Sequence, residues 1–129
     1  MNQECICRIR NIYRAIAQFE ASLQQELGLN INEAMLLCLV ADKAHISSGE
    51  IASEMNLTPS NASKVIAALE KGRLIRRKAC KEDKRCMKFC VTKKGEELLH
   101  RLTCDSLQLP HSLQKLSDQV EPQEHDRSF

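Results

Sequence analysis

Apolar residues recur at spacings of three and four along the start of the chain, which predicts an amphipathic helix over residues 3–27. The stripe consists of Ile9, Ile12, Tyr13, Ile16, Phe19, Leu23 and Leu27. Gly28 follows as a stop signal. The next run, AMLLCLVA, is apolar nearly all round, which predicts a central buried helix that ends near Lys43. Asn30 or Asn32 can cap this helix, and residues 44–46 form a short link that could be a strand.

Two shorter helices with clear start signals follow over residues 47–71. Ser47 and Glu50 have the spacing of a capping box, which predicts a helix over residues 49–55. Thr58-Pro59, a capping hydroxyl followed by proline, predicts a helix over residues 59–71 that Gly72 ends. Two short helices joined by a tight turn are typical of a helix-turn-helix, although any two-helix corner of an all-α protein has this outline.

The pattern then changes to that of a β-hairpin over residues 73–91. Residues 74–80 are strand-like, residues 81–84 are charged and turn-like, and residues 86–91 alternate between apolar and other side chains. A hairpin with a basic tip directly after a helix-turn-helix is a wing. Thr92 begins a further helical segment over residues 92–120, which Pro110 interrupts, and residues 121–129 are a polar tail that we expect to fray. The predicted fold is mainly α with a small β-wing, in a single winged-helix domain over residues 1–129.

The uneven distribution of charge along the chain indicates what kind of partner this fold binds. Residues 64–101 hold 13 Lys and Arg against 5 Asp and Glu, whereas the rest of the chain holds 6 against 12. A basic segment in a chain of net charge +2 indicates a surface for a polyanion. The chain has no Trp, one Tyr and three Phe, which argues against a platform that stacks single-stranded bases. No apolar run approaches the roughly 20 residues of a membrane helix, and the N-terminus lacks a signal-peptide core, so we expect a cytoplasmic protein with no membrane partner.

The order helix, helix, helix-turn-helix, β-wing, helix resembles the MarR family of bacterial winged-helix regulators. The most specific stretch is DKRCMKFCVTKKG at residues 83–95, which is similar to the wing pattern D-x-R-x-x-x-L-x-L-T-x-x-G of that family. Phe89 and Val91 replace the two leucines. The stretch SNASKVIAALEKGRLIRR resembles the recognition helix of the family and its Gly-bounded exit. The likeness covers about residues 29–102, and it implies a homodimeric regulator, most often a repressor, that binds a pseudo-palindromic DNA duplex and can respond to a small-molecule effector.

The resemblance also implies roles for particular residues. Those expected to contact DNA are Ser60, Asn61, Ser63 and Lys64 on the second helix of the motif and Lys81, Lys84 and Arg85 on the wing. Arg85 would enter the minor groove, and the lysines would contact phosphates. Asp83 would brace Arg85 or Arg76 by an ion pair, and at least one residue of the run Arg76-Arg77-Lys78 should be structural. The alternative is that Ser60 and Asn61 only serve the helix start and that the wing lysines are a solvated tip.

Further side chains suggest a dimer and a ligand site. Ile9, Ile12, Ile16 and Phe19 form a stripe that, together with Leu99 and Leu102, could pack against a second copy. The alternative for these six is an ordinary core within one chain. Tyr13, Met35 and Cys38 could line a ligand pocket between the dimer helices and the DNA-binding part, although such residues are more often simple core.

The seven cysteines allow a redox function. Cys86 and Cys90 share a strand face with Lys88, a cation that could lower a thiol pKa, and Cys80 lies across the same hairpin. Oxidation there would move Arg85 and release DNA. Cys5 and Cys7 lie near the place where peroxide-sensing relatives carry a reactive cysteine. Buried or idle thiols are the commoner case.

The sequence lacks signs of other chemistry. No C-x-x-C pair occurs and the four histidines are scattered, so we predict no metal and no cofactor. We also find no paired carboxylates, nucleophile–base pair or phosphate cradle, so we predict no enzyme. The rival is a winged-helix module that binds protein, which would carry apolar residues where this chain has a basic wing.

Overall fold

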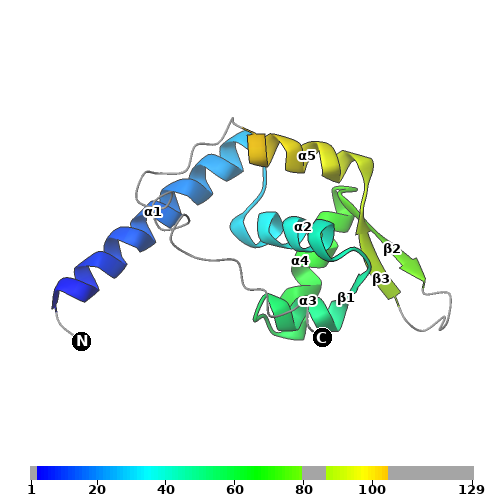
Figure 1. The fold of residues 1–129 in the computed structure, drawn as a ribbon, viewed down its shortest axis with the longest axis horizontal. Helices are drawn as coiled ribbons and strands as arrows, with labels where there is room; N and C mark the ends of the chain where they lie inside the picture. Colours follow the sequence, from blue (N-terminus) through cyan, green and yellow to red (C-terminus); the bar gives the residue numbers. More distant parts are fainter. Residues whose placement is uncertain (1–2, 80–86, 105–129) are drawn as a thin grey trace. The chain divides into compact units, whose positions relative to one another are not determined.

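The computed structural model describes residues 3–79 and 87–104 of the chain. Its elements are α1 (Gln3–Leu27), α2 (Ile31–Lys43), β1 (Ile46–Ser47), α3 (Ser48–Glu54), α4 (Pro59–Lys71), β2 (Ile75–Ala79), β3 (Met87–Val91) and α5 (Lys93–Cys104) (Figure 1). Helices thus dominate, with one small antiparallel sheet, which confirms the predicted fold class. The chain forms two compact units, of which one includes Met1–Ser22 and the other spans Leu23–Leu107.

Side-chain caps begin three of the helices. Asn30 rather than Asn32 caps α2, where its side chain accepts a hydrogen bond from the Glu33 amide and the Glu33 carboxylate accepts one from the Asn30 amide. Ser47 and Glu50 form the same reciprocal box at α3. The Thr58 hydroxyl accepts a hydrogen bond from the Asn61 amide over 3.1 Å and caps α4. Each cap satisfies an amide at a helix start that has no partner within the helix, so these boundaries follow from local sequence.

The sheet has three strands in the order β1-β3-β2. Ile46 of β1 pairs with Phe89 of β3, while the β2–β3 register runs from Ile75 opposite Val91 to Ala79 opposite Met87. The sequence suggested a strand at residues 44–46, and the observed strand lies at Ile46–Ser47. The short strand β1 therefore ties the start of the helix-turn-helix to the wing.

The core of the Leu23–Leu107 unit is built mainly from α2, α3, α4 and one face of the sheet. Its buried side chains are Leu23, Leu29, Ala34, Leu36, Leu37, Val40, Ile46, Ile51, Ala62, Ile66, Leu69, Leu74, Ile75 and Phe89. The helix α2 is not buried all round, because Met35 is 48% exposed and Cys38 is exposed. No helix within residues 3–79 and 87–104 is long and apolar enough to cross a membrane.

Thr92 and Gly95 join the root of the wing to α5. The Thr92 hydroxyl lies 2.6 Å from the Arg73 carbonyl oxygen, to which it donates, and it accepts a hydrogen bond from the Gly95 amide over 3.1 Å. Gly95 is buried, and a Cβ added there would collide with the Leu74 carbonyl oxygen and lie 2.7 Å from Cγ1 of Val91. The T-x-x-G part of the wing pattern is therefore structural.

Candidate nucleic-acid interface

The helix α4 separates its side chains into a buried and an exposed face. Ala62, Ile66 and Leu69 are buried, and Val65 is half-buried. The exposed residues near its start include Ser60, Asn61, Ser63 and Lys64. All four residues predicted to face the DNA groove are therefore exposed to solvent, as the helical period requires.

The polar groups of this exposed face are not consumed by the helix start. Thr58 supplies the cap. Within the described residues, the side chains of Ser60, Asn61 and Ser63 make no hydrogen bond and Lys64 makes no ion pair. The first turn of α4 carries no acidic residue that would repel a phosphate. Hydroxyl, amide and ammonium groups therefore stay available for phosphates or base edges.

The tip of the wing lies outside the described residues. The predicted DNA contacts Lys81, Lys84 and Arg85, the predicted brace Asp83, and the thiols of Cys80 and Cys86 all fall there. The described strands carry further basic side chains. Arg76 and Lys78 share one face of β2, and Lys88 of β3 lies directly opposite Lys78. Cys90, opposite Arg76, shares this face with Lys88, as the alternation predicted.

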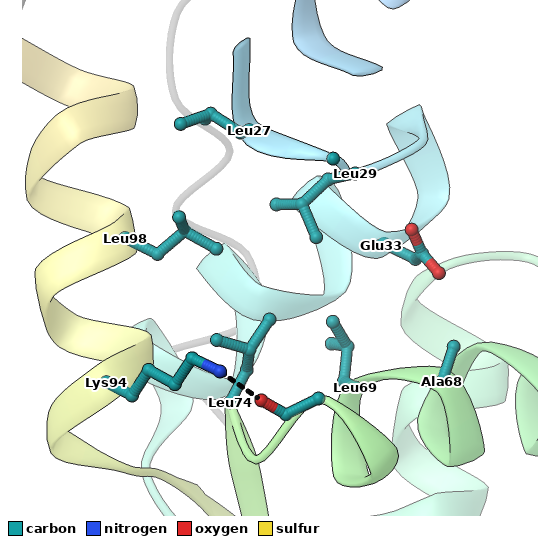
Figure 2. A pocket seen from close by; sticks show the side chains of 10 residues that line it. Leu27, Leu29, Glu33, Ala68, Leu69, Leu74, Lys94 and Leu98 are labelled. Carbon is teal, nitrogen blue, oxygen red and sulfur yellow. Dashed lines mark hydrogen bonds between the residues drawn. The ribbon is translucent and has the colours of Figure 1, made fainter. Parts of the chain in front are cut away.

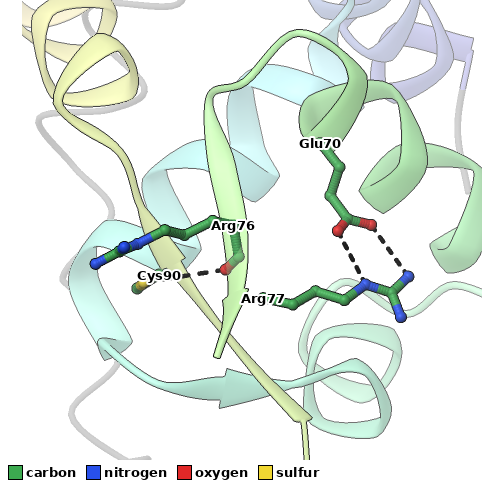
Figure 3. Close-up of polar contacts among 4 residues, drawn as sticks. All are labelled: Glu70, Arg76, Arg77 and Cys90. Carbon is green, nitrogen blue, oxygen red and sulfur yellow. Dashed lines mark hydrogen bonds and ion pairs between the residues drawn. The ribbon is translucent and has the colours of Figure 1, made fainter. Parts of the chain in front are cut away.

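Arg77 lies on the other face of β2 and contacts α4 (Figure 3). Its Nε is 2.9 Å from Oε2 of Glu70 and its terminal nitrogen is 3.1 Å from Oε1, a two-point ion pair. Its guanidinium carbon is 5.5 Å from the ring centroid of Phe89. The hydrogen bonds to Glu70, and then the negative charge of Glu70, raise the pKa of Arg77. The sequence predicted that at least one residue of the run Arg76-Arg77-Lys78 is structural, but it did not indicate Glu70 as the partner.

A hollow of about 250 Å³ lies beside the end of α4. Figure 2 shows leucines of α1, α4, α5 and the adjoining turns around it, with Lys94 at one side, whose Nζ donates to the Gly72 carbonyl oxygen over 3.1 Å. A smaller hollow of about 200 Å³ lies between α3, α4 and the sheet, with Ser63, Arg77 and Phe89 in its wall.

The residues predicted to line a ligand pocket are placed apart from these hollows. Cys38 lines a shallow depression of about 490 Å³ with Asp42 of α2 and His100 of α5. Met35 is exposed on α2, and Tyr13 on α1 is 74% exposed. Neither residue lines that depression. Sequence reasoning missed the 250 Å³ hollow because its walls come from three separate segments, residues 27–33, 68–74 and 94–98.

The described thiols differ in their surroundings. The Cys90 Sγ lies 3.9 Å from the Arg76 carbonyl oxygen, and this residue is half-buried. Cys5 is exposed and Cys7 is half-buried on α1. Although part of Cys38 is exposed, burial of its sulfur raises the pKa of the thiol. The part of the chain that the structure describes holds no group of three His, Cys, Asp or Glu side chains suited to a metal ion.

The predicted dimer residues lie on α1 and α5. On α1, Ile9 is 54% exposed and Ile16 is 36% exposed, while Ile12 and Phe19 are half-buried. The same helix exposes Ile6 and Tyr13, which extend the stripe at helical spacing. Leu99 and Leu102 on α5 are half-buried.

The helices α3 and α4 with the antiparallel hairpin β2–β3 that follows them define a winged helix-turn-helix protein. The family model described as MarR family matches residues 29–87, so this segment is similar to the MarR family.

Individual proteins are similar to this chain as well. The chain is 28% identical over 103 residues to the HTH-type transcriptional regulator PapX of Escherichia coli, covering 78% of this chain and 60% of the length of PapX. The solved structure of MepR, a transcription regulator of the Staphylococcus aureus multidrug efflux pump MepA, superposes with a TM-score of 0.70 at 18% identity, covering 99% of this chain and 91% of MepR. Streptococcus pneumoniae FabT in complex with DNA superposes with a TM-score of 0.72 at 18% identity, covering 98% of this chain and 87% of FabT.

Proposed function

We propose that this chain is a cytoplasmic, sequence-specific double-stranded DNA-binding regulator of transcription, a repressor, that acts as a homodimer. The observation that carries the proposal is the exposed face of α4, where Ser60, Asn61, Ser63 and Lys64 present uncommitted polar groups and one cation. This face belongs to a family segment that matches regulators, and FabT, which shares the fold, was solved in complex with DNA.

In this proposal, the first half of α4 lies in the major groove and the wing lies over the adjacent minor groove. Ser and Asn side chains hydrogen-bond to phosphates or base edges, and Lys64 supplies charge. Lys81 and Lys84 contact phosphates, while Arg85 enters the minor groove, where its planar and weakly hydrated guanidinium suits a narrow A·T tract. Asp83 braces Arg85 or Arg76. The basic excess of residues 64–101 supports this placement because duplex binding is dominated by the phosphate charge.

A homodimer presents two copies of α4 to two half-sites about one helical turn apart, which makes the operator pseudo-palindromic. The exposed apolar stripe of α1 supports this assembly, since monomeric proteins seldom leave such a contiguous stripe in water.

Release of DNA is proposed to follow either a small effector or thiol oxidation. The 250 Å³ hollow supports the first route, because it is leucine-lined and carries one cation, Lys94, at its side. The half-buried Cys90, which shares a strand face with Lys88, is the described thiol that supports the second route. Cys38 is a poor sensor, because burial raises the pKa of its thiol.

The proposal is tested by selecting duplexes from a random library and measuring the affinity of the selected duplex at several salt concentrations. We expect a palindromic consensus and a logarithm of the affinity that falls steeply with the logarithm of the salt concentration, because bound phosphates release counterions. A flat salt dependence together with no enriched sequence would contradict the proposal and favour the protein-binding module.

A further inference from the structure

We propose that the ion pair between Glu70 and Arg77, seated on Phe89, is a positioning device that fixes the wing against the recognition helix so that both fit one duplex at once. This inference rests on the proposed function. In this inference Arg77 does not contact a phosphate, although it belongs to the basic run Arg76-Arg77-Lys78.

The geometry joins three elements through one side chain. Glu70 lies in the last turn of α4, Arg77 in the middle of β2, and Phe89 in β3, where it is the residue directly opposite Arg77. Both carboxylate oxygens of Glu70 accept hydrogen bonds from Arg77, over 2.9 and 3.1 Å. Two parallel hydrogen bonds fix orientation as well as distance, which a single contact cannot do.

The surroundings of the pair keep Arg77 in this direction. The guanidinium carbon lies 5.5 Å from the ring centroid of Phe89, a residue that is buried in the core at 2% exposure. Arg76 and Lys78 point to the other face of the strand, so only Arg77 of these three basic residues faces Glu70 and Phe89. Figure 3 shows Arg76 directed away from Glu70 while Arg77 reaches it.

The ion pair links the end of α4 directly to the middle of β2, beyond the turn that joins the two elements. The strand β2 leaves α4 after a three-residue turn that includes Arg73 at φ 61°. A rotation of β2 about its root would change the placement of the hairpin relative to α4. Such a positioning error would cost affinity in a two-site contact, because the recognition helix and the wing could no longer bind together.

The test exploits the sign of the charge change. Glu70→Gln makes the chain more positive by one charge, so electrostatics alone predicts tighter binding to any DNA. Loss of positioning predicts weaker binding to the selected duplex. A partly exposed ion pair biases geometry by a factor of about five at most per subunit. We expect specific affinity of the dimer to fall about fivefold to tenfold, while affinity for a scrambled duplex is unchanged or rises.

Three further variants separate positioning from charge and from folding. Glu97→Gln removes an exposed carboxylate of α5 and should leave the ratio of specific to non-specific affinity unchanged. Arg77→Lys keeps the charge but loses the two-point contact, and it should lower the ratio much as Glu70→Gln does. The double variant Glu70→Arg with Arg77→Glu keeps the net charge and should restore the ratio in part.

A readout without DNA accompanies these affinities. The Nε–H group of Arg77 should be ordered in the nuclear magnetic resonance relaxation of the parent protein and mobile in Glu70→Gln, at matched circular dichroism. If Glu70→Gln fails to fold, Arg77→Lys carries the comparison.

The outcomes are distinct. A parent protein that selects no duplex overturns the proposed function and this inference with it. A parent that binds its duplex, with an unchanged affinity ratio in both Glu70→Gln and Arg77→Lys, overturns the positioning role alone.

Discussion

Gly95 has a backbone position that only the smallest side chain can occupy. It lies at the third residue of α5, where its amide donates to the Thr92 hydroxyl and its Cα faces the carbonyl of Leu74. Glycine usually weakens a helix, so its use inside α5 needs a steric reason. The close approach between α5 and the strand root supplies that reason.

We predict that Gly95→Ala destabilises the protein by about 1–3 kcal/mol, because the added methyl group would overlap with the Leu74 carbonyl and Val91. Chemical denaturation measures the change. Gly49→Ala is the matched control, since nothing lies within 4 Å of its added Cβ and alanine favours the helix α3. Equal effects of the two substitutions would contradict the steric explanation.

Arg73 occupies the left-handed region at φ 61°, which L-residues avoid, whereas the neighbouring Gly72 has φ −77°. Gly72, the helix stop expected from the sequence, therefore lies one residue before Arg73, the residue whose left-handed conformation a glycine would adopt without strain. Gly72 is nonetheless the C-cap of α4, as predicted.

We predict that Arg73→Gly stabilises the fold by about 0.5–1 kcal/mol, because relief of the left-handed conformation exceeds the added entropy of the unfolded chain. Thermal unfolding of the variant beside the parent tests this. Lys71→Gly, two residues earlier within α4, should instead cost about 1 kcal/mol. Destabilisation by both substitutions would show that Arg73 is not strained.

At the scale of elements, α4 combines a core face with a solvent face that stays polar along its first half. The contribution of a single lysine to DNA binding then depends on its position along the helix. Lys64 lies beside Ser63 near the start, whereas Lys71 is the last residue of α4.

We predict that Lys64→Ala weakens binding to all duplexes and lowers the slope of the salt dependence by about 1 per subunit, as expected for one lost phosphate contact. Filter binding at several salt concentrations measures the slope. Lys71→Ala removes the same charge from the far end of the helix and should leave the slope close to that of the parent. A larger effect at Lys71 would place the opposite end of α4 on DNA.

The helices were predictable because their start and stop signals are local. Asn30, Ser47 and Thr58 each act on residues within one turn, and the observed caps are among those that the sequence offered. The pairing of Ile46 with Phe89 was not predictable, since 43 residues separate the two and no local pattern records the pairing. Glu70 as the partner of Arg77 depends on the same long-range register.

For the whole molecule, the exposed stripe of α1 has the largest consequence. Ile6, Ile9, Tyr13 and Ile16 follow helical spacing and remain in contact with solvent in a single chain. Burying them against a second copy would remove apolar area from water at roughly 25 cal/mol per Å².

We predict that Ile9→Glu combined with Ile16→Glu converts a dimer into a folded monomer that binds DNA weakly, because charges would be buried in the interface. Sedimentation at micromolar concentration measures the mass, and circular dichroism checks the fold. Gln18→Glu adds an acidic group at an exposed position of the same helix, outside the isoleucine stripe, and should preserve the dimer. A parent protein that sediments as a monomer would contradict the prediction.

The Thr92 hydroxyl joins three neighbouring segments. It donates to the carbonyl oxygen of Arg73, in the turn after α4, and it accepts from the Gly95 amide in the first turn of α5. We therefore expect the end of α4, the root of the wing and the start of α5 to unfold as one cooperative unit. Amide hydrogens there should exchange in a single opening event, so a change that loosens α5 should also reach the hairpin.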